Sequence, residues 1–421
     1  MSSDILDRLT VWSDRRIAGE LAIDRGGAMH FSYAADWLAD PSARALSHAL
    51  PKQEHAFGDA LCKAVFGGLL PEEGQRTAIA RALGVSPDNP FRLLAALGGD
   101  VAGALAFLPD GEEPPLTPEG EPTEPLADAA LADLIGRLPR VPMLAGEGGA
   151  RLSLAGAQGK LPVVLIEGAI AVPRIGEAST HLIKPEPDRF PGLAVNEAFC
   201  LALARAVGLD AAMAAWREAD GKPYLLVTRY DRLCQDEQTL RLHQEDFAQA
   251  LGVPSNRKYA SEGGPTFRDG FTLVRQATTR PAREVLKLAD AALFNVIIGN
   301  ADAHAKNYSL LRRADGEVVL APLYDLVATH MWPELAAKLA MRFGRAATLE
   351  EVDGESFERF ASDAGLGLPF LRRRTAALAA RVQEVIAEGV TVPGLEDRAC
   401  LGELPTIVLD RASRFALKAQ A

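Results

Sequence analysis

The residues with the most specific chemistry lie in the segment Gly299 to Asn307, GNADAHAKN, which places Asp302 five residues before Asn307. A carboxylate can accept the proton of an attacking hydroxyl group, and a carboxamide oxygen one short loop later can hold Mg²⁺, as phosphoryl transfer requires. Asp and Asn also favour turns and helix caps, so the same spacing occurs in polar turns that follow a helix. The segment alone therefore leaves a catalytic loop and a structural turn as alternatives.

Asp325 adds a third oxygen donor, eighteen residues after Asn307 in the sequence APLYDL. Between them, LLRRADGEVVLAP predicts a β-hairpin, and kinases place a second metal-binding Asp after a short hairpin of this kind. The alternative for Asp325 is an N-cap in a Pro/Tyr turn, and the letters Tyr-Asp-Leu do not match the Asp-Phe-Gly motif of kinases. The position of Asp325 favours a site in which three oxygen donors converge.

Lys184 lies upstream in THLIKP, at the end of an apolar run that predicts a strand. A strand would direct its ammonium group into a cleft, where it could neutralise the α- and β-phosphates of ATP. Glu197, in the following predicted helix NEAFCLALA, is a candidate ion-pair partner for this lysine. The alternative for Glu197 is a first-turn acid that interacts with the helix dipole.

The small residues of the segment Ser153 to Lys160, SLAGAQGK, form a candidate phosphate-binding loop before a predicted strand. Because bulky side chains are few, backbone N–H groups could approach phosphate oxygens. The loop is not a Walker A motif, which would need Gly in place of Leu154 and Ser or Thr in place of Leu161. An ordinary turn of small residues is the alternative.

The elements that must position these residues begin with a mixed N-terminal region. Short apolar runs broken by Asp-Arg and Gly-Gly predict β-hairpins between Leu9 and Phe31. Apolar residues spaced by three and four predict short helices over residues 59–66, 76–83 and 90–97. The first hundred residues are therefore predicted to be α+β.

Proline and acidic residues dominate the segment Pro109 to Pro125, PDGEEPPLTPEGEPTEP, which contains no basic residue. Such a segment can form neither a helix nor a central strand, so we expect a solvated loop or linker. A second helix-poor stretch, AGEGGAR, ends at Arg151. Together they place the first domain boundary near residue 148.

Three β-like runs follow, LPVVLIEGAIAVP, STHLIKP and YLLVTRYD, and a helix from Asn196 to Val207, which Gly208 would end, interrupts them. From Gln244 onward, helices are predicted over EDFAQALG, ALFNVIIGN, ELAAKLAMRF, FERFASDAG and TAALAARVQEVIAEG. The expected fold class is α+β in three parts: an N-terminal subdomain (1–148), a nucleotide-binding part (149–232) and a helical lobe (233–421).

Composition limits the class of protein. With 421 residues, 48% of them hydrophobic, the chain can bury a large core and is neither disordered nor fibrous. Its formal net charge of −11 disfavours direct DNA binding. No long apolar stretch and no signal-peptide pattern occur, so we expect a cytoplasmic protein. The four cysteines are far apart and the histidines form no zinc motif, so oxygen atoms would have to hold any metal.

Taken together, these segments resemble the HipA family of bacterial serine/threonine kinases, the toxins of type II toxin–antitoxin modules. The matching segments follow the family order over roughly residues 150–330: LSLAGAQGK, THLIKP, NEAFCLALARAVGL, VTRYDR, HQEDFAQALG, IGNADAHAKNYS and APLYDL. The segments VWSDRRIAGEL, FSYAADWL and ALSHALP also resemble the N-terminal subdomain of the family. The resemblance implies a bilobal protein-kinase-like fold with an extra N-terminal α+β subdomain and a mostly helical C-terminal lobe.

The resemblance also implies roles for the matching residues. Asp302 is the expected catalytic base, and His304 and Lys306 are expected in the catalytic loop beside the γ-phosphate, where they would offset developing charge. Asn307 and Asp325 are the expected Mg²⁺ ligands. The expected ATP-binding residues, the last three of which form the hinge that receives adenine, are Ser153, Ala155, Gly156, Ala157, Gln158, Lys184, Thr228, Arg229 and Tyr230.

Ser153 also matches the serine at which members of the family phosphorylate themselves. A phosphate there would repel ATP and displace the loop, which implies self-inactivation. Gly159 replaces an acidic residue common in the family loop, and Ala303 replaces the glycine of the family's DGH sequence. Neither change removes a catalytic group, so we expect an active kinase.

The implied activity is ATP- and Mg²⁺-dependent phosphorylation of an aminoacyl-tRNA synthetase, with glutamyl-tRNA synthetase as the expected substrate. Modification would block aminoacylation, arrest growth and promote persistence, and a HipB-like helix-turn-helix antitoxin would be the partner. One alternative is a catalytically weak co-repressor for which this antitoxin supplies the DNA contacts. Another is a small-molecule kinase, which would use the same catalytic groups.

The segment from His243 to Pro265, HQEDFAQALGVPSNRKYASEGGP, matches the family but suggests no chemical step. Its basic residues Arg257 and Lys258 could meet a substrate or only solvent, and we expect solvent, which most charged side chains face.

Overall fold

The computed structural model describes residues 5–115, 118, 123–145, 151–235, 238–332, 334–335 and 338–420. The chain divides into two compact units: unit 1 is Met1–Lys184, Ala219–Lys222 and Arg229–Asn256, and unit 2 is Pro185–Glu218, Pro223–Thr228 and Arg257–Ala421. The predicted boundary near residue 148 lies outside the described residues. Within the Pro-rich segment, the residues after Pro109 that are described form neither helix nor strand.

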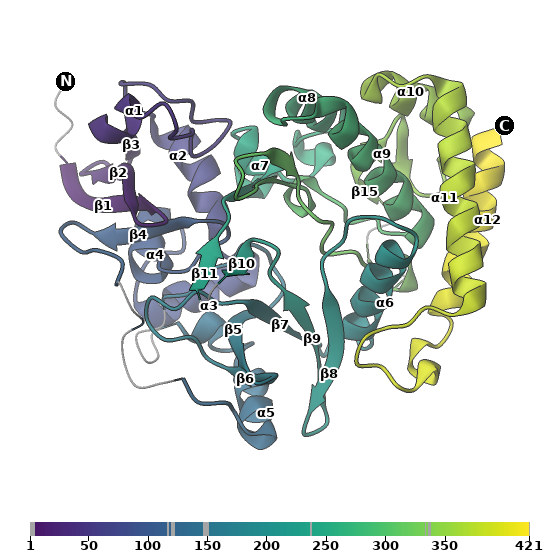
Figure 1. Cartoon of the computed structure of the whole chain (residues 1–421), viewed down its shortest axis with the longest axis horizontal. Helices are drawn as coiled ribbons and strands as arrows, with labels where there is room; N and C mark the ends of the chain where they lie inside the picture. Colours follow the sequence, from purple (N-terminus) through teal and green to yellow (C-terminus); the bar gives the residue numbers. More distant parts are fainter. Residues whose placement is uncertain are drawn as a thin grey trace. The chain divides into compact units, whose positions relative to one another are not determined.

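Unit 1 begins with a four-stranded antiparallel sheet in the order β3-β2-β1-β4 (Figure 1). Its elements are β1 (Ile5–Ser13), β2 (Arg16–Asp24), β3 (Met29–Tyr33), α1 (Ala35–Ala39), α2 (Asp59–Val65), α3 (Glu73–Leu83), α4 (Pro90–Leu97), β4 (Leu105–Pro109), α5 (Asp128–Arg137), β5 (Leu161–Ile166), β6 (Ala169–Ala171), β7 (His181–Pro185), β10 (Arg232–Gln235), β11 (Gln238–Arg241), β12 (Gln244–Asp246) and α7 (Phe247–Ala250).

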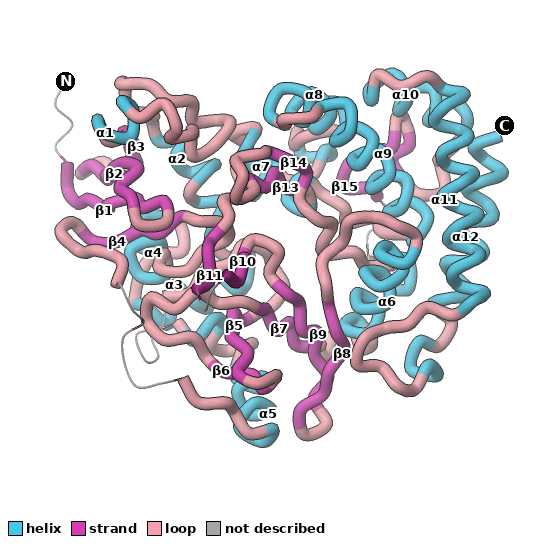
Figure 2. The backbone as a smooth tube through the Cα atoms, in the orientation of Figure 1, coloured by secondary structure: helices cyan, strands magenta, loops and turns pink. Residues whose placement is uncertain are grey.

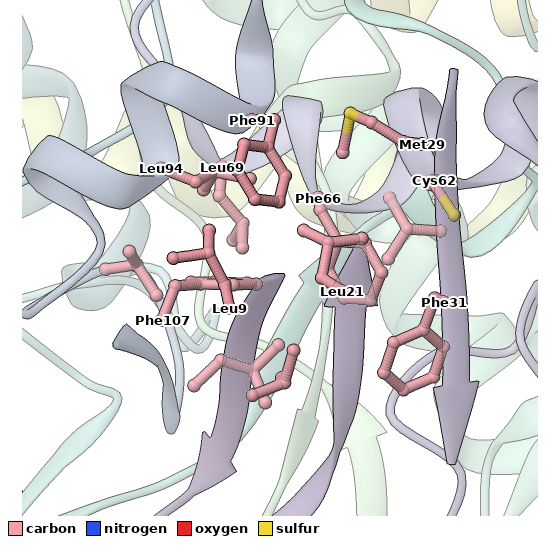
Figure 3. Close-up of a cluster of buried hydrophobic side chains, with 14 of the residues drawn as sticks. Leu9, Leu21, Met29, Phe31, Cys62, Phe66, Leu69, Phe91, Leu94 and Phe107 are labelled. Atoms are coloured by element: carbon pink, nitrogen blue, oxygen red, sulfur yellow. The ribbon is translucent and has the colours of Figure 1, made fainter. Parts of the chain in front are cut away.

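Tight turns and alternating apolar residues explain the N-terminal hairpins. Asp14 turns the chain between β1 and β2 with φ at 56°, and Gly27 does so between β2 and β3 with φ at 83°. The apolar residues of the strands face helices α2 and α4, and Figure 3 shows Leu21, Phe66 and Phe91 among the buried side chains there. The predicted hairpins between Leu9 and Phe31 and the three predicted helices are confirmed.

A second antiparallel group in unit 1 has the order β6-β5-β7. Leu161 of β5 pairs with Ile183 of β7, which places the end of β7 beside the start of β5. The loop from Ser153 to Lys160 enters this group directly, because β5 begins at the next residue. The strands predicted in LPVVLIEGAIAVP and STHLIKP are confirmed.

Unit 2 is mainly helical, as Figure 2 shows for the part of the chain from α8 onward. Its elements are α6 (Leu193–Ala206), β8 (Ala214–Ala219), β9 (Lys222–Thr228), α8 (Phe267–Ala277), α9 (Pro281–Ile298), β13 (Ser309–Arg312), β14 (Val318–Leu320), β15 (Lys338–Phe343), β16 (Ala346–Thr348), α10 (Gly354–Ala364), α11 (Leu368–Glu388) and α12 (Leu404–Gln420). The turn between β8 and β9 belongs to unit 1.

An aromatic cluster holds the helices of unit 2 together. The rings of Phe343 and Phe360 stack with centroids 4.3 Å apart, and Phe357 packs edge-on against Phe343 at 5.2 Å. Beside this cluster α11 and α12 run alongside each other (Figure 1). The helix α9 is buried along most of its length and therefore forms a rigid support for the loop that follows it.

One predicted helix is wrong. ELAAKLAMRF was expected to be helical, but its second half is strand β15, which pairs with β16. The backbone N–H of Ala340 also donates to the carbonyl of Ala301 at 2.8 Å. Tertiary pairing therefore overrides the helix propensity of this alanine- and leucine-rich segment.

The described part of the chain has no helix with the length and hydropathy of a membrane span. The four cysteines are not joined by disulfides. Cys62 and Cys200 are buried, and burial raises the pKa of both thiols to about 12, which keeps them protonated and unreactive.

Candidate active site

Helix α9 ends where the candidate catalytic loop begins. Gly299 caps it in the left-handed conformation, with φ at 77°, and donates its N–H to the carbonyls of Asn295 and Val296. A Cβ at this position would lie 2.8 Å from Nε of Arg411, so the close approach also requires glycine. The glycine, rather than an Asp or Asn, thus occupies the left-handed cap position.

The loop then turns so that only its carboxylate residue is exposed. The N–H of His304 donates to the carbonyl of Asp302 at 2.7 Å, and the N–H of Asn307 donates to the carbonyl of His304 at 2.9 Å. Residues Ala305–Asn307 complete a short 3₁₀ helix. Asp302 is exposed, whereas residues 303–310 are buried. An acceptor hydroxyl can therefore reach the Asp302 carboxylate, while the rest of the loop is fixed by packing.

A buried carboxamide, Asn300, joins the two candidate acidic residues through their backbones. Its Oδ1 accepts the N–H of Asp302 at 3.1 Å, and its Nδ2 donates to the carbonyl of Asp325 at 3.4 Å. Nδ2 also donates to Oδ1 of Asn295 at 2.8 Å, and Asn295 in turn donates to the hydroxyl of Tyr308 at 3.1 Å. The sequence reasoning assigned no role to Asn300 or Asn295, although a polar side chain in the apolar run NVIIGN was an available signal.

Asp325 is held in a strained conformation, with φ at 53°. The hydroxyl of its neighbour Tyr324 donates to the carbonyl of Lys306 at 2.7 Å, which ties this segment to the candidate catalytic loop. The next 3₁₀ helix begins at Thr329 with Ala328 as its cap, so the alternative of Asp325 as an N-cap is wrong. A strained non-glycine residue is typical of a functional position.

The loop contains a buried oxygen suited to a metal ion. Oδ1 of Asn307 is buried and accepts no hydrogen bond from any residue that the structure describes. An unsatisfied buried amide oxygen is costly, and Mg²⁺ coordination would satisfy it. The described residues contain no cluster of three His, Cys, Asp or Glu side chains that could hold a metal ion. Mg²⁺ usually keeps waters and substrate phosphates as ligands, so one or two protein oxygens are enough for a site. Oδ1 of Asn307 fits such a site, and Mg²⁺ binding by the Asp325 carboxylate stays a prediction.

A tyrosine from an earlier segment also reaches this loop. The hydroxyl of Tyr259 donates to Oδ1 of Asp302 at 3.1 Å, and its ring lies edge-on to the ring of His304, with centroids 5.5 Å apart. Lys258, expected in solvent, is only 6% exposed, which corrects the prediction, whereas Arg257 is exposed as predicted. Tyr259 lies 43 residues before Asp302, and no local spacing pointed to it.

The candidate phosphate-binding loop lies in unit 1 and is fixed at both ends. The Ser153 side chain is fully buried, and its hydroxyl donates to the carbonyl of Leu69 at 3.0 Å. Gly156, with φ at 114°, accepts the N–H of Glu72 at 3.1 Å. Nζ of Lys160 donates to the carbonyl of Ala155 at 2.7 Å. The segment is therefore an ordered loop, and its interaction with phosphate stays a prediction for Ala155, Gly156, Ala157 and Gln158.

Lys184 and Glu197 are both buried. Lys184 is the fourth residue of β7 and only 4% exposed, so it is not a solvated surface lysine. Glu197 is 2% exposed and lies beyond the first turn of α6, which begins at Leu193. The alternative of a first-turn acid for Glu197 is therefore wrong. The ion pair between the two stays a prediction, since they belong to different units.

The predicted hinge leads into a buried ionic cluster in unit 1. Thr228 ends β9 and donates its N–H to the carbonyl of Met213 at 2.8 Å. The hydroxyl of Tyr230 donates to Gln244. Arg229 is buried, and its Nη2 donates to Asp231 at 2.8 Å. Its side chain is thus structural, and adenine binding by this backbone segment stays a prediction.

Asp100, from the N-terminal region, is the centre of this cluster. Its carboxylate accepts hydrogen bonds from Nη2 of Arg232 at 2.7 Å and from Oγ of Ser179 at 2.5 Å, and Nη1 of Arg229 lies 3.5 Å away. Burial alone would raise the pKa of Asp100, but the charges of Arg232 and Arg229 outweigh it and hold the pKa well below its usual range. Asp100 is therefore a buried anion. The sequence reasoning did not identify it.

The structure thus places the predicted residues in two sets. Unit 2 brings together the catalytic loop and the metal-site candidates: Asp302, His304, Lys306, Asn307 and Asp325. Glu197 and Thr228 also belong to unit 2, and unit 1 holds Ser153, Ala155, Gly156, Ala157, Gln158, Lys184, Arg229 and Tyr230.

Comparison with known proteins agrees with this geometry. The model of the HipA-like C-terminal domain matches residues 152–390, and that of the HipA N-terminal domain matches residues 9–108. The chain is 52% identical over 384 residues to "Putative kinase Y4mE" of Sinorhizobium fredii (strain NBRC 101917 / NGR234), covering 90% of this chain and 91% of the relative. It is 31% identical over 420 residues to "Serine/threonine-protein kinase toxin HipA" of Shewanella oneidensis (strain MR-1), covering 94% of this chain and 93% of the relative.

A solved structure is similar over almost the full length. It is described as "Shewanella oneidensis MR-1 Toxin Antitoxin System HipA, HipB and its operator DNA complex", and it superposes with a TM-score of 0.86 at 28% identity, covering 98% of both chains. The expected α+β fold, with a kinase-like bilobal core and an N-terminal subdomain, is confirmed. With both family domains matched and this structural agreement, the chain belongs to the HipA family of serine/threonine kinase toxins.

Proposed function

We propose that this protein is an ATP- and Mg²⁺-dependent serine/threonine kinase that transfers the γ-phosphate of ATP to a protein hydroxyl group. The observation that carries the proposal is the catalytic loop of unit 2. Its exposed carboxylate, Asp302, already accepts a hydrogen bond from a hydroxyl group, and its buried amide oxygen, Asn307 Oδ1, lacks a described partner. These are the two groups that the reaction requires one short loop apart.

Each group would have a distinct task. Asp302 would orient the acceptor hydroxyl and take its proton as the new O–P bond forms. Lys306 and His304, both buried in the same loop, would offset the negative charge that develops on the transferred group. Asn307 and Asp325 would hold Mg²⁺, which supplies charge neutralisation at the phosphates. Lys184 would bind the α- and β-phosphates.

The proposed substrate is an aminoacyl-tRNA synthetase, with glutamyl-tRNA synthetase as the first candidate. Its modification would stop aminoacylation, arrest growth and promote persistence in the cytoplasm. Membership of a kinase toxin family supports this proposal. Autophosphorylation of Ser153 would end the activity, and it requires this serine to leave its buried bond to Leu69.

The direct test is transfer of ³²P from ATP to purified glutamyl-tRNA synthetase. We expect labelling by the wild-type protein with Mg²⁺ and a loss of at least about 10³-fold for Asp302→Ala, because the acceptor loses its base and its orientation. Equal labelling by wild type and Asp302→Ala would refute the assigned mechanism. Phosphoproteomics of cells that express each protein would identify another substrate as a serine modified only by the wild type.

A co-repressor role is the second candidate, because the similar solved structure contains HipA with HipB and operator DNA. A HipB-like antitoxin would supply the DNA contacts that a chain of net charge −11 disfavours. The two functions are compatible. If the wild type binds ATP with Mg²⁺ no better than Asp325→Ala does in calorimetry, the co-repressor function alone is supported.

A further inference from the structure

The segment Arg257 to Gly264 has no part in the proposed mechanism, yet its backbone is closely constrained. The carbonyl of Tyr259 accepts the N–H of Glu262 at 3.0 Å and the N–H of Gly264 at 2.9 Å. A Cβ on Gly264 would lie 2.1 Å from the carbonyl oxygen of Arg257, so this return of the chain is possible only for glycine. The loop therefore closes on itself and fixes the position of Tyr259.

Three contacts fix the Tyr259 side chain in turn. Its hydroxyl donates to Oδ1 of Asp302 at 3.1 Å, and its ring contacts the His304 ring edge-on. Nζ of Lys258 lies 5.3 Å from the ring centroid, within the range in which a cation is attracted to the face of the ring. Lys258 is buried, which keeps this ammonium group near the ring.

Strand β15 supports both residues of the hydrogen bond between Tyr259 and Asp302. The N–H of its Ala340 donates to the carbonyl of Ala301, the residue before Asp302. The 3₁₀ turn Ala260–Glu262, directly after Tyr259, packs on the same strand. Tyr259 and Asp302 are thus held by one common support, so their separation does not depend on a flexible surface.

From this geometry, and resting on the proposed kinase function, we propose that Tyr259 is a positioning residue for Asp302. Asp302 is exposed, and an exposed carboxylate rotates freely unless one of its oxygens is held. The Tyr259 hydroxyl holds Oδ1 and so restricts the rotation of the carboxylate that would receive the acceptor hydroxyl. Such orientation acts on the rate of phosphoryl transfer rather than on ATP binding.

The test is Tyr259→Phe, which removes one oxygen and keeps the ring that contacts His304. With glutamyl-tRNA synthetase as acceptor, we expect kcat to fall about 10- to 100-fold, the range for loss of a hydrogen bond to a charged group, with the KM for ATP unchanged. Tyr33→Phe is the matched control, because it removes a hydroxyl bonded to the carbonyl of Leu50 in the N-terminal core. We expect its kcat to equal that of the wild type.

A double-mutant cycle separates positioning from a general structural effect. In the Asp302→Ala background, Tyr259→Phe should cause no further loss of residual transfer, because the group it orients is absent. Wild-type kcat for Tyr259→Phe, a higher kcat, or an equal loss in both backgrounds would overturn the inference. If the wild type transfers no phosphate, the proposed function itself fails, and if wild type and Asp302→Ala transfer phosphate equally, the assigned role of Asp302 fails. Both outcomes are distinct from the others.

Discussion

Replacing Asp100 by Asn tests how the N-terminal region supports the candidate ATP-binding segments. The backbone of Asp100 pairs with the loop before β5, because its N–H donates to the carbonyl of Arg151 at 2.9 Å and its carbonyl accepts the N–H of Ser153 at 3.0 Å. Its carboxylate binds Arg232 at 2.7 Å in the segment after the predicted hinge. One buried residue thus connects the Ser153 loop with that segment.

The expected cost follows from the charges of the cluster. In the wild type, Asp100 and Asp231 balance the buried guanidinium groups of Arg229 and Arg232. Asp100→Asn leaves one buried positive charge without its partner, and breaking a buried ion pair costs about 3–5 kcal/mol. The Asn side chain can still accept a hydrogen bond, so we expect the lower end, about 3 kcal/mol.

Hydrogen exchange of the backbone amides measures this cost locally. A loss of about 3 kcal/mol should speed exchange about 100-fold in peptides that contain residues 151–153 and 229–232, provided exchange follows local opening. The KM for ATP should rise together with the exchange rate in Asp100→Asn, because the two predicted nucleotide-binding segments lose their common support. Asp133→Asn is the control, since the Asp133–Arg137 pair is exposed and such pairs contribute less than about 1 kcal/mol. Unchanged exchange in Asp100→Asn, or an equal change in Asp133→Asn, would refute the reasoning.

Two further predictions concern charge and the catalytic loop. In the folded state the arginine charges outweigh the effect of burial and lower the pKa values of Asp100 and Asp231. The two ionised carboxylates therefore stabilise the folded protein fully above about pH 4, and this stabilisation is lost as the pH falls. The difference in melting temperature between wild type and Asp100→Asn should therefore shrink from pH 6 to pH 3, and a constant difference would contradict the assignment. Asn300→Ala should lower kcat by about 10-fold or more, because it leaves the buried backbone groups of the loop unpaired. Asn89→Ala, which removes a helix cap of α4, should lower stability by about 1 kcal/mol without changing kcat, and equal kcat values for the two variants would contradict this role of Asn300.

Local sequence rules predicted the elements whose neighbours are close in sequence. The Asp14 turn and the alternating apolar residues of β1 to β3 are local features, and they specified the N-terminal hairpins correctly. In ELAAKLAMRF, the same rules failed, because Ala340 bonds to Ala301, a residue distant in sequence. Lys258 was mispredicted for a similar reason, since no local pattern indicates that this lysine is buried in the folded chain.

In the candidate site, too, some residues could be predicted from local sequence patterns and others could not. The spacing of Asp302, Asn307 and Asp325 was visible because these residues lie on one loop and the hairpin after it. Tyr259 and Asn300 act through hydrogen bonds to backbone or carboxylate groups that a linear pattern does not specify. The residues proposed to perform the chemistry were therefore predictable from spacing, whereas those proposed to orient them required the folded structure.

Asp100 connects the ranges matched by the two family domains. It lies within the range matched by the HipA N-terminal domain, whereas Arg229 and Arg232 lie within the range of the C-terminal domain. The two ranges share one buried ionic cluster inside a single compact unit. A fragment that begins after residue 108 would lack Asp100. Arg229 and Arg232 would then be buried with Asp231 as their remaining acidic partner in the cluster, and this lowers stability for the same reason as Asp100→Asn does. The N-terminal domain is therefore part of the structural support of the candidate ATP-binding segments, and the proposed kinase function should require both domains in one chain.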